Sequence, residues 1–340
     1  MHFRKETKNM KNILLIGGAG YVGSVITDFL LRNGYKVTCF DGFLYENQRT
    51  VIPYILNENY KFISGDLCDE DAVKKALVGI DSVVLLAGLV GDPITKKYPD
   101  LSKKINDDGI MNLFQVMNGK GIERLIFIST CSNYGLIQND ELADENFELS
   151  PLSLYAKAKV AAEKELLSEK NNFDYSTVVL RFATAFGLSP RMRFDLTVSE
   201  FTKDLILGKE LLVYDAHTWR PYCHVKDFAR LIDIVLKSPK EKTHKEVFNA
   251  GGEINNFTKQ GILDIILKYL PNSKVSFKEH GSDPRNYKVN FSKVKSVLGF
   301  EPKYTVEDGV KELIEAFQLN LFKNLEHDIN FHGNYTINYR

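Results

Sequence analysis

A tyrosine and a lysine spaced four residues apart, Tyr155 and Lys159, carry the clearest chemical signal in this sequence. Ser150 and Pro151 lie just before them and favour the start of a helix, on which residues i and i+4 share one face. A phenol with a pKa of about 10 is a poor base at neutral pH, but a neighbouring ammonium favours the phenolate. With Thr130, a hydroxyl at the end of an apolar run, the pair predicts a proton-transfer site, although the spacing alone also occurs in surface pairs.

A glycine-rich segment, ILLIGGAGYVGS, predicts a site for a dinucleotide. Gly17, Gly20 and Gly23 follow an apolar run and open an amphipathic one. Glycines placed between a strand and a helix make a tight turn, let the backbone approach a diphosphate and allow close packing. The helix N-terminus adds free N–H groups and partial positive charge. Asp41, eighteen residues after Gly23, would accept hydrogen bonds from a ribose and repel a 2′-phosphate, so NAD is favoured over NADP.

These two sets of residues need a scaffold that brings distant parts of the chain together. Short β-branched runs alternate with amphipathic stretches, which is typical of a parallel sheet covered by helices. One helix is expected near residues 21–34, ended by Gly34. Strands are expected at residues 12–18, 36–41, 60–66, 82–88, 124–130 and 175–182, with a late one at 247–252. The sequence thus predicts an α/β fold with a doubly wound parallel sheet of the Rossmann type.

The regular alternation fades beyond Gly187, where loops and short elements are expected. We therefore predict an NAD-binding domain that comprises residues 11–187 plus 247–252. A smaller C-terminal substrate-binding domain, interleaved with the first, should comprise residues 188–246 and 253–340.

The overall composition excludes several classes of partner. The 340 residues include 44 basic and 44 acidic side chains, so no net field draws the chain to nucleic acid or to anionic lipid. No apolar run approaches the roughly 20 residues that span a bilayer, and residues 1–10 are too polar for a signal peptide, which predicts a cytoplasmic protein. Four widely spaced cysteines predict reduced thiols and no bound metal.

The motifs together resemble the extended short-chain dehydrogenase/reductases of the nucleotide-sugar epimerase/dehydratase group. The resemblance rests on the G-x-x-G-x-x-G spacing, the strand-end hydroxyl, Y-x-x-x-K, and matching stretches at WRPYCHVKD and NAGG. It runs from residue 12 to about residue 317 and implies an NAD-dependent enzyme. The cofactor contacts that it implies are Gly17, Gly20, Tyr21, Val22, Gly23, Asp41, Asp66, Leu67, Leu86, Ala87, Gly88, Asn106, Tyr155 and Lys159.

The resemblance also implies a role for each catalytic residue. Thr130 would hydrogen-bond the reacting sugar hydroxyl, Tyr155 would remove its proton, and Lys159 would order the ribose and lower the tyrosine pKa. The sugar carbon would then give hydride to the nicotinamide. The substrate contacts that it implies are Thr130, Ser132, Arg193, Arg220 and Arg285, with Arg285 at a position that often clamps a nucleotide diphosphate.

Departures from the family pattern narrow the reaction. Sugar-nucleotide 4,6-dehydratases resemble S-T-D-E-x-Y-G in the region of residue 130, but Cys131 and Ser132 replace the Asp and Glu, so water loss is disfavoured. Thr184 and Leu188 replace the usual Asn and Pro. The stretch RFATAFGLSPRMRFD looks like members that serve bacterial surface-polysaccharide sugars, including GDP-heptose 4-dehydrogenases.

Three functions stay open at this point. The first is a dehydrogenase that oxidises the C4 hydroxyl of a nucleotide sugar, with a GDP-sugar favoured. The second is a 4-epimerase that forms the 4-keto sugar only transiently, and the third is a non-catalytic NAD-binding regulator. The resemblance implies a homodimer or higher homo-oligomer, built through the helices that carry Asn106 and Tyr155.

Overall fold

The computed structural model describes residues 11–137, 141–281, 285–323 and 325–339. Residues 1–10, whose polar character argues against a signal peptide, lie outside this part of the chain.

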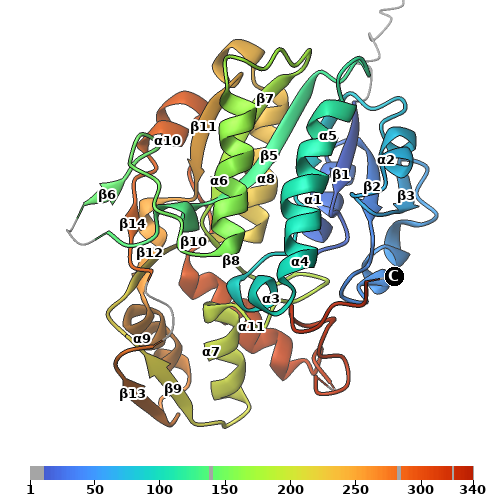
Figure 1. Cartoon of the computed structure of the whole chain (residues 1–340). Helices are drawn as coiled ribbons and strands as arrows, with labels where there is room; N and C mark the ends of the chain where they lie inside the picture. The colour runs from blue at the N-terminus through green and yellow to red at the C-terminus, as the bar shows by residue number, and fades with distance from the viewer. Residues whose placement is uncertain (1–10, 138–140, 282–284, 324, 340) are drawn as a thin grey trace, which may run out of the picture.

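A seven-stranded parallel sheet forms the centre of the molecule (Figure 1) and confirms the predicted α/β fold. Its order is β11-β7-β5-β4-β1-β2-β3, so the chain reverses direction across the sheet between β1 and β4. The predicted late strand is present, paired with β7 at the edge. The strands are β1 (Asn12–Ile16), β2 (Lys36–Asp41), β3 (Tyr60–Ser64), β4 (Ser82–Leu85), β5 (Arg124–Thr130), β7 (Ser176–Phe182) and β11 (Glu246–Ala250).

Helices cover both faces of this sheet because its strands are apolar on both sides. In β1, Ile13 and Leu15 point into one core cluster with α1 and α8, whereas Leu14 and Ile16 point into a second with α2, α5 and α6. The helices of this layer are α1 (Tyr21–Arg32), α2 (Glu70–Ala76), α3 (Asp92–Lys97), α4 (Pro99–Ser102), the π-helical η3 (Lys103–Gly109), α5 (Ile110–Val116), α6 (Leu154–Leu167), α8 (Val225–Lys237) and α10 (Ser292–Leu298).

A smaller region with its own core cluster lies below the sheet in Figure 1. Its helices are α7 (Thr197–Ile206), α9 (Lys259–Tyr269) and α11 (Val306–Gln318). Its strands are β8 (Thr184–Phe186), β9 (Leu211–Tyr214), β10 (Trp219–His224), β12 (Asn256–Thr258) and β13 (Val275–Lys278), with a short pair β6 (Leu142–Ala143) and β14 (Lys288–Val289) alongside. Short 3-10 turns lie at Gln48–Thr50, Ile52–Tyr54, Cys131–Tyr134, Lys240–Lys242 and Glu253–Asn255.

Two segments lie elsewhere than the sequence-based division suggests. Helix α8 falls within the range 188–246 but packs against α1, and Phe228 and Ile232 enter the core of the large sheet. The C-terminal tail, residues 325–339, leaves the smaller region and runs back beside the large one (Figure 1). Helices of ten to thirteen residues also persist beyond Gly187, where loops and short elements were expected. The exact domain boundaries stay a prediction.

Candidate active site

A cavity of about 1150 Å³ opens at the carboxyl ends of the strands, where β1 and β4 diverge. Ligands of doubly wound sheets bind at this point because the loops on either side separate there. With one exception, Asn106, every predicted site residue lines this cavity. The fold therefore brings the glycine-rich segment, the Tyr/Lys pair and the arginines into one space, while their individual roles stay predictions.

The glycine-rich turn leaves room only for backbone. A Cβ on Gly17, whose φ is +88°, would lie 2.8 Å from the Ala87 nitrogen, and one on Gly23 would lie 2.3 Å from the Gly17 carbonyl oxygen. A Cβ on Gly20 would meet nothing closer than 3.4 Å, so Gly20 presents open backbone to the cavity at the N-terminus of α1. This cradle fits the diphosphate of a dinucleotide.

Asp41 ends β2 inside the cavity and is fixed by backbone donors. The N–H of Ala19 donates to its Oδ2 at 3.1 Å, and the N–H of Phe43 donates to its Oδ1 at 2.9 Å. Burial raises the pKa of this carboxyl group, and these backbone hydrogen bonds oppose the rise. Asp41 thus presents its carboxyl group to the cavity, and its contact with the adenosine ribose stays a prediction.

We expect NAD to bind at least tenfold more tightly than NADP, a difference of about 1.4 kcal/mol, because Asp41 repels a 2′-phosphate. Asp41→Ala should narrow this gap when both cofactors are titrated by calorimetry. Glu46→Ala removes an exposed acid from the same cavity and should change the ratio by less than about twofold because solvent screens it. Equal affinities of the unaltered protein for both cofactors would contradict the assignment.

Asn106 lies behind the cavity wall instead of in it. Its side chain accepts from the N–H of Leu89 at 2.8 Å and donates to the Leu89 carbonyl at 3.0 Å, and it is almost completely buried. Its Oδ1 is also the atom that a Cβ on Gly88 would meet, at 2.9 Å. Asn106 thus holds the segment after β4, in which Leu86, Ala87 and Gly88 line the cavity, and its own contact with the cofactor stays a prediction.

Asp66 reaches the cavity but already has a partner that sequence reasoning did not identify. The hydroxyl of Tyr339, near the C-terminus, donates to its Oδ2 at 2.5 Å. Asn334 and Tyr335 from the same tail also line the cavity. The end of the chain thus forms part of the wall that was expected to hold adenine.

The catalytic helix α6 begins at Leu154, three residues later than the Ser150 and Pro151 signal suggested. Ser153 caps it, since its hydroxyl accepts from the Ala156 N–H at 3.1 Å. Tyr155 therefore lies in the first turn, where the Thr130 side chain at the end of β5 opposes the rise in its pKa. Lys159 follows one turn later and donates from Nζ to the Ile128 carbonyl at 2.7 Å.

The electrostatic environment of Tyr155 differs from the expectation that Lys159 lowers its pKa. Burial raises the pKa of Tyr155, and the groups that oppose the rise are first Arg193 and then Thr130. Lys159 lies 5.9 Å from the centre of the Tyr155 ring, and burial lowers its own pKa to about 7. The fixed positive charge that acts on the phenol without a cofactor is therefore Arg193, a residue expected to bind substrate.

A buried polar network anchors α6 to the sheet. Glu163, one turn beyond Lys159, accepts from Arg181 Nη2 at 2.8 Å and from Asn133 Nδ2 at 2.8 Å, and it also accepts from the Ser129 hydroxyl. Both charged side chains are about 95% or more buried. Glu163 is not among the predicted site residues, although its spacing of four residues from Lys159 places both side chains on one face of the helix.

Three of the predicted substrate residues, Ser132, Arg220 and Arg285, lie together around Tyr287. Arg285 donates to the Ser132 hydroxyl at 3.3 Å and forms an ion pair with Asp92 at 3.4 Å. The guanidinium of Arg220 lies 5.1 Å from the ring centre of Tyr287. These positive groups give one end of the cavity the character of an anion site.

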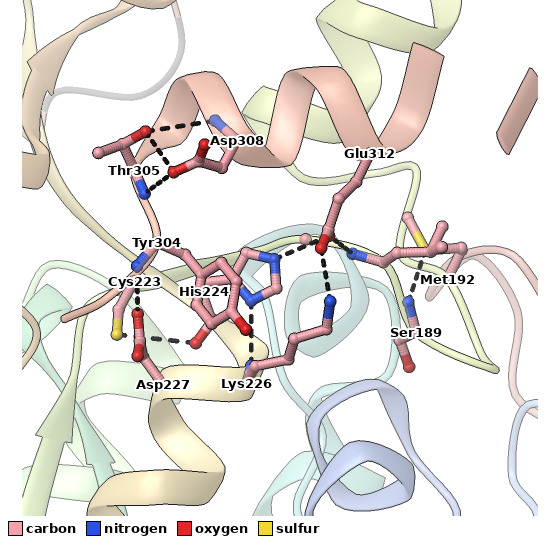
Figure 2. A network of polar contacts seen from close by, with 12 residues as sticks. Ser189, Met192, Cys223, His224, Lys226, Asp227, Tyr304, Thr305, Asp308 and Glu312 are labelled. Atoms are coloured by element: carbon pink, nitrogen blue, oxygen red, sulfur yellow. Dashed lines mark hydrogen bonds and ion pairs between the residues drawn. The ribbon is translucent and has the colours of Figure 1, made fainter. Parts of the chain in front are cut away.

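Glu312 on α11 fixes the turn that follows β8 (Figure 2). It accepts from Lys226 Nζ at 2.5 Å and from the Leu188 N–H at 3.2 Å, and its Oε2 lies 2.9 Å from His224 Nε2. Nδ1 of His224 accepts the Lys226 N–H, so Nε2 carries the proton and donates to Glu312. Burial alone would raise the Glu312 pKa, but these bonds outweigh it and lower the pKa to about 2. Proline, usual at position 188 in the family, has no N–H to donate.

Comparison with known proteins identifies the family of this chain. The model of the NAD dependent epimerase/dehydratase family matches residues 13–251. The chain belongs to this family. The predicted kinship, the class of enzyme and the cofactor NAD are thereby confirmed.

Individual members of the family differ in what they do. The chain is 28% identical to a dTDP-glucose 4,6-dehydratase of Streptomyces niveus over 91% of its length and 93% of the relative's. It is 27% identical to a UDP-glucuronate 4-epimerase of Thermodesulfobacterium geofontis, covering 91% and 96%. A crystal structure of Thermotoga maritima UDP-glucose 4-epimerase with UDP-glucose matches with a TM-score of 0.80 at 27% identity, covering 92% and 100%.

A solved complex also bears on the cofactor. UDP-glucuronic acid 4-epimerase from Bacillus cereus, crystallised with UDP-glucuronic acid and NAD, matches with a TM-score of 0.81 at 25% identity, covering 91% and 99%.

Among the described residues, none of the helices has the length and apolar character that crossing a membrane requires. The same residues include no group of three or more His, Cys, Asp or Glu side chains placed to hold a metal ion.

Proposed function

We propose that this protein oxidises the C4 hydroxyl of a nucleotide-activated sugar, with a GDP-sugar as the favoured substrate. The observation that carries the proposal is that Thr130 and Tyr155 line the same cavity as the glycine-rich cradle, Arg220 and Arg285. A nucleotide sugar bound by its diphosphate at Arg220 and Arg285 would extend its sugar toward the phenol. Bidentate guanidinium groups suit such a diphosphate.

Each residue of the chain has a defined task in this reaction. Thr130 holds the sugar hydroxyl, and Tyr155 takes its proton. Because burial raises the phenol pKa, positive charge from Arg193 and Lys159 is needed to make the phenolate. NAD, when bound, accepts the hydride that leaves the sugar carbon.

The position of Cys131 argues against a dehydratase. Cys131 is 1% exposed, and its thiol donates to the Arg181 carbonyl at 3.1 Å instead of facing the cavity. Burial also raises the pKa of this thiol well above its usual range. Ser132 does face the cavity, but a hydroxyl is a poor general base. A 4-keto sugar formed here would lack the acid and base pair that dehydratases carry at the positions of Cys131 and Ser132.

The second candidate is a 4-epimerase, which is favoured by the named 4-epimerases among the relatives and solved structures. It would use the same Thr130, Tyr155 and Lys159, and it would differ only in returning the hydride to the other face of the sugar. The GDP preference and a place in surface-polysaccharide synthesis rest on the RFATAFGLSPRMRFD stretch, whereas the named relatives use UDP- and dTDP-sugars.

The product should keep its C6 oxygen. We expect mass spectrometry, after incubation with NAD and a panel of GDP-, UDP- and dTDP-sugars, to show either a loss of two hydrogens or no mass change. The first outcome accompanies reduced NAD, visible by its absorbance, and marks a dehydrogenase. The second, with a changed sugar configuration by NMR, marks an epimerase. Loss of one water as the main product would contradict the reading of Cys131 and Ser132.

A cytoplasmic location fits this proposal, because all four cysteines are unpaired thiols, as expected in a reducing compartment. The homodimer or higher oligomer stays a prediction. Helices α5 and α6, expected to form its interface, lie side by side on one face of the molecule (Figure 1), and Leu154 at the start of α6 is exposed.

A further inference from the structure

Arg191 is a buried cation without a bonded carboxylate. Its side chain is 3% exposed and lines the cavity. Nη2 donates to the carbonyls of Asn330 and Gly333 and to the side chain of Asn334, at 3.1, 2.9 and 2.8 Å. Nε has no hydrogen-bond partner among the described residues. Arg181 and Arg193, by contrast, each bond a carboxylate. Buried charges are normally paired, so the Arg191 environment lacks an anion.

The backbone around Arg191 is fastened to the start of α1. The hydroxyl of Ser189 donates to the Tyr21 carbonyl at 2.7 Å and lies 3.1 Å from the hydroxyl of Ser24. The N–H of Arg191 in turn donates to the Ser189 hydroxyl at 3.3 Å. The segment that carries Arg191 is therefore held against the helix N-terminus that follows the glycine cradle.

The charged groups that act on Arg191 indicate its position along the cavity. Asp41, at the ribose end of the cavity, and Arg193, which acts on Tyr155, both influence its guanidinium electrostatically. Burial, followed by Arg193, lowers the Arg191 pKa to about 10. A bound dinucleotide that reaches from Asp41 to Tyr155 must place its diphosphate between these two points.

We propose that Arg191 binds the diphosphate of NAD as a second donor beside the glycine cradle, held in place by the C-terminal tail. This inference rests on the NAD-dependent reaction proposed above and adds a binding residue to it. Arg191 stacks on Tyr45, with the guanidinium 4.9 Å from the ring centre, while the tail occupies only Nη2. Nη1 makes none of these bonds and is free to donate to a phosphate oxygen.

The test compares ligands with and without a diphosphate on Arg191→Met, which keeps the aliphatic stem and removes the charge. NAD and ADP-ribose should bind about 30-fold more weakly by calorimetry, since a charged hydrogen bond is lost. Adenosine, measured by displacement of fluorescent NADH, should change by less than about threefold because it has no phosphate. Arg191→Lys should give an intermediate loss, because it keeps the charge without the fork.

A matched control distinguishes the effect of the Arg191 guanidinium on affinity from the effect of disturbing the C-terminal tail. Arg49→Gln breaks an exposed ion pair between Arg49 and Asp328 of the tail and should leave ADP-ribose affinity within about twofold. Equal losses for adenosine and ADP-ribose in Arg191→Met would show that Arg191 merely shapes the wall. A loss confined to GDP or UDP would place the anion on the substrate instead. Either result overturns the proposal.

The proposed function can fail independently of this inference. If the unaltered protein converts no nucleotide sugar, yet Arg191→Met loses ADP-ribose affinity selectively, the reaction is wrong and the diphosphate contact stands. Melting temperatures measured without ligand test whether Arg191→Met is folded. We expect the variant to remain folded because it loses no ion pair.

Discussion

Replacing Tyr155 with Phe should lower kcat on the order of 100-fold or more, because the change removes the proton acceptor and keeps the ring. The ring is buried in the first turn of α6 and lines the cavity together with Thr130. Since Lys159 and the glycine cradle are unchanged, NAD should still bind with nearly its normal affinity. Steady-state turnover of the nucleotide sugar identified by the substrate panel, together with NAD titration, measures both quantities.

Tyr134→Phe is the matched control for this loss. Tyr134 is also fully buried, but its hydroxyl donates to Asn249 at 2.7 Å and it does not line the cavity. The same hydroxyl accepts from Arg181 Nη1 at 3.0 Å. Losing both hydrogen bonds, one of them charged, should cost about 2–4 kcal/mol of stability, while kcat changes little. Near-normal turnover of Tyr155→Phe would mean that another group takes the proton.

Glu163→Gln should lower the free energy of unfolding by about 3–5 kcal/mol, because it leaves the charge of Arg181 buried and unpaired. Arg181 donates to Glu163 through Nε and Nη2, and Ser129 and Asn133 complete the network. Gln preserves the size of the side chain but supplies a neutral acceptor. Because Glu163 lies one turn after Lys159, the loss should also weaken the anchoring of the catalytic helix.

Chemical denaturation of the unaltered protein and of Glu163→Gln measures the difference in their free energies of unfolding. NAD is left out so that cofactor binding does not contribute. Glu301→Gln provides the comparison, since its ion pair with Lys295 is about 64% exposed on both sides and should be worth less than about 1 kcal/mol. A cost for Glu163→Gln as small as that of the exposed pair would show that the buried pair does not stabilise the fold.

Local patterns were sufficient to predict the large sheet and most of the cavity. Apolar runs such as Ile13–Ile16 mark strands buried on both faces, and a parallel sheet carries the ends of its strands to one edge. The sequence alone therefore predicts that Gly17, Asp41 and Thr130 lie close together. The chemistry of Tyr155 and Lys159 followed from their separation by one helical turn.

Local patterns were less informative where tertiary contacts override them. Asn106 matched a family position, but the direction of its side chain depends on the β4 end that it holds. The packing of α8 on α1 likewise joins segments about two hundred residues apart, beyond what a hydrophobic period can reveal. Arg193, a residue predicted to bind substrate, is the first of the groups that oppose the rise in the Tyr155 pKa, because distance and burial set such interactions.

The sequence by itself determined the fold class and the cofactor, and it predicted the catalytic residues, because each depends on spacing within one or two elements. Only the tertiary structure decided what surrounds them. Arg191 bonds the Asn330 carbonyl 139 residues further along the chain, and Tyr339 reaches Asp66 across 273. The tail also contacts distant segments elsewhere, since Asn334 donates to the Val90 carbonyl and the Asn338 N–H donates to the Leu44 carbonyl. Such pairings are fixed by the packed geometry of the whole chain, and no local pattern encodes them.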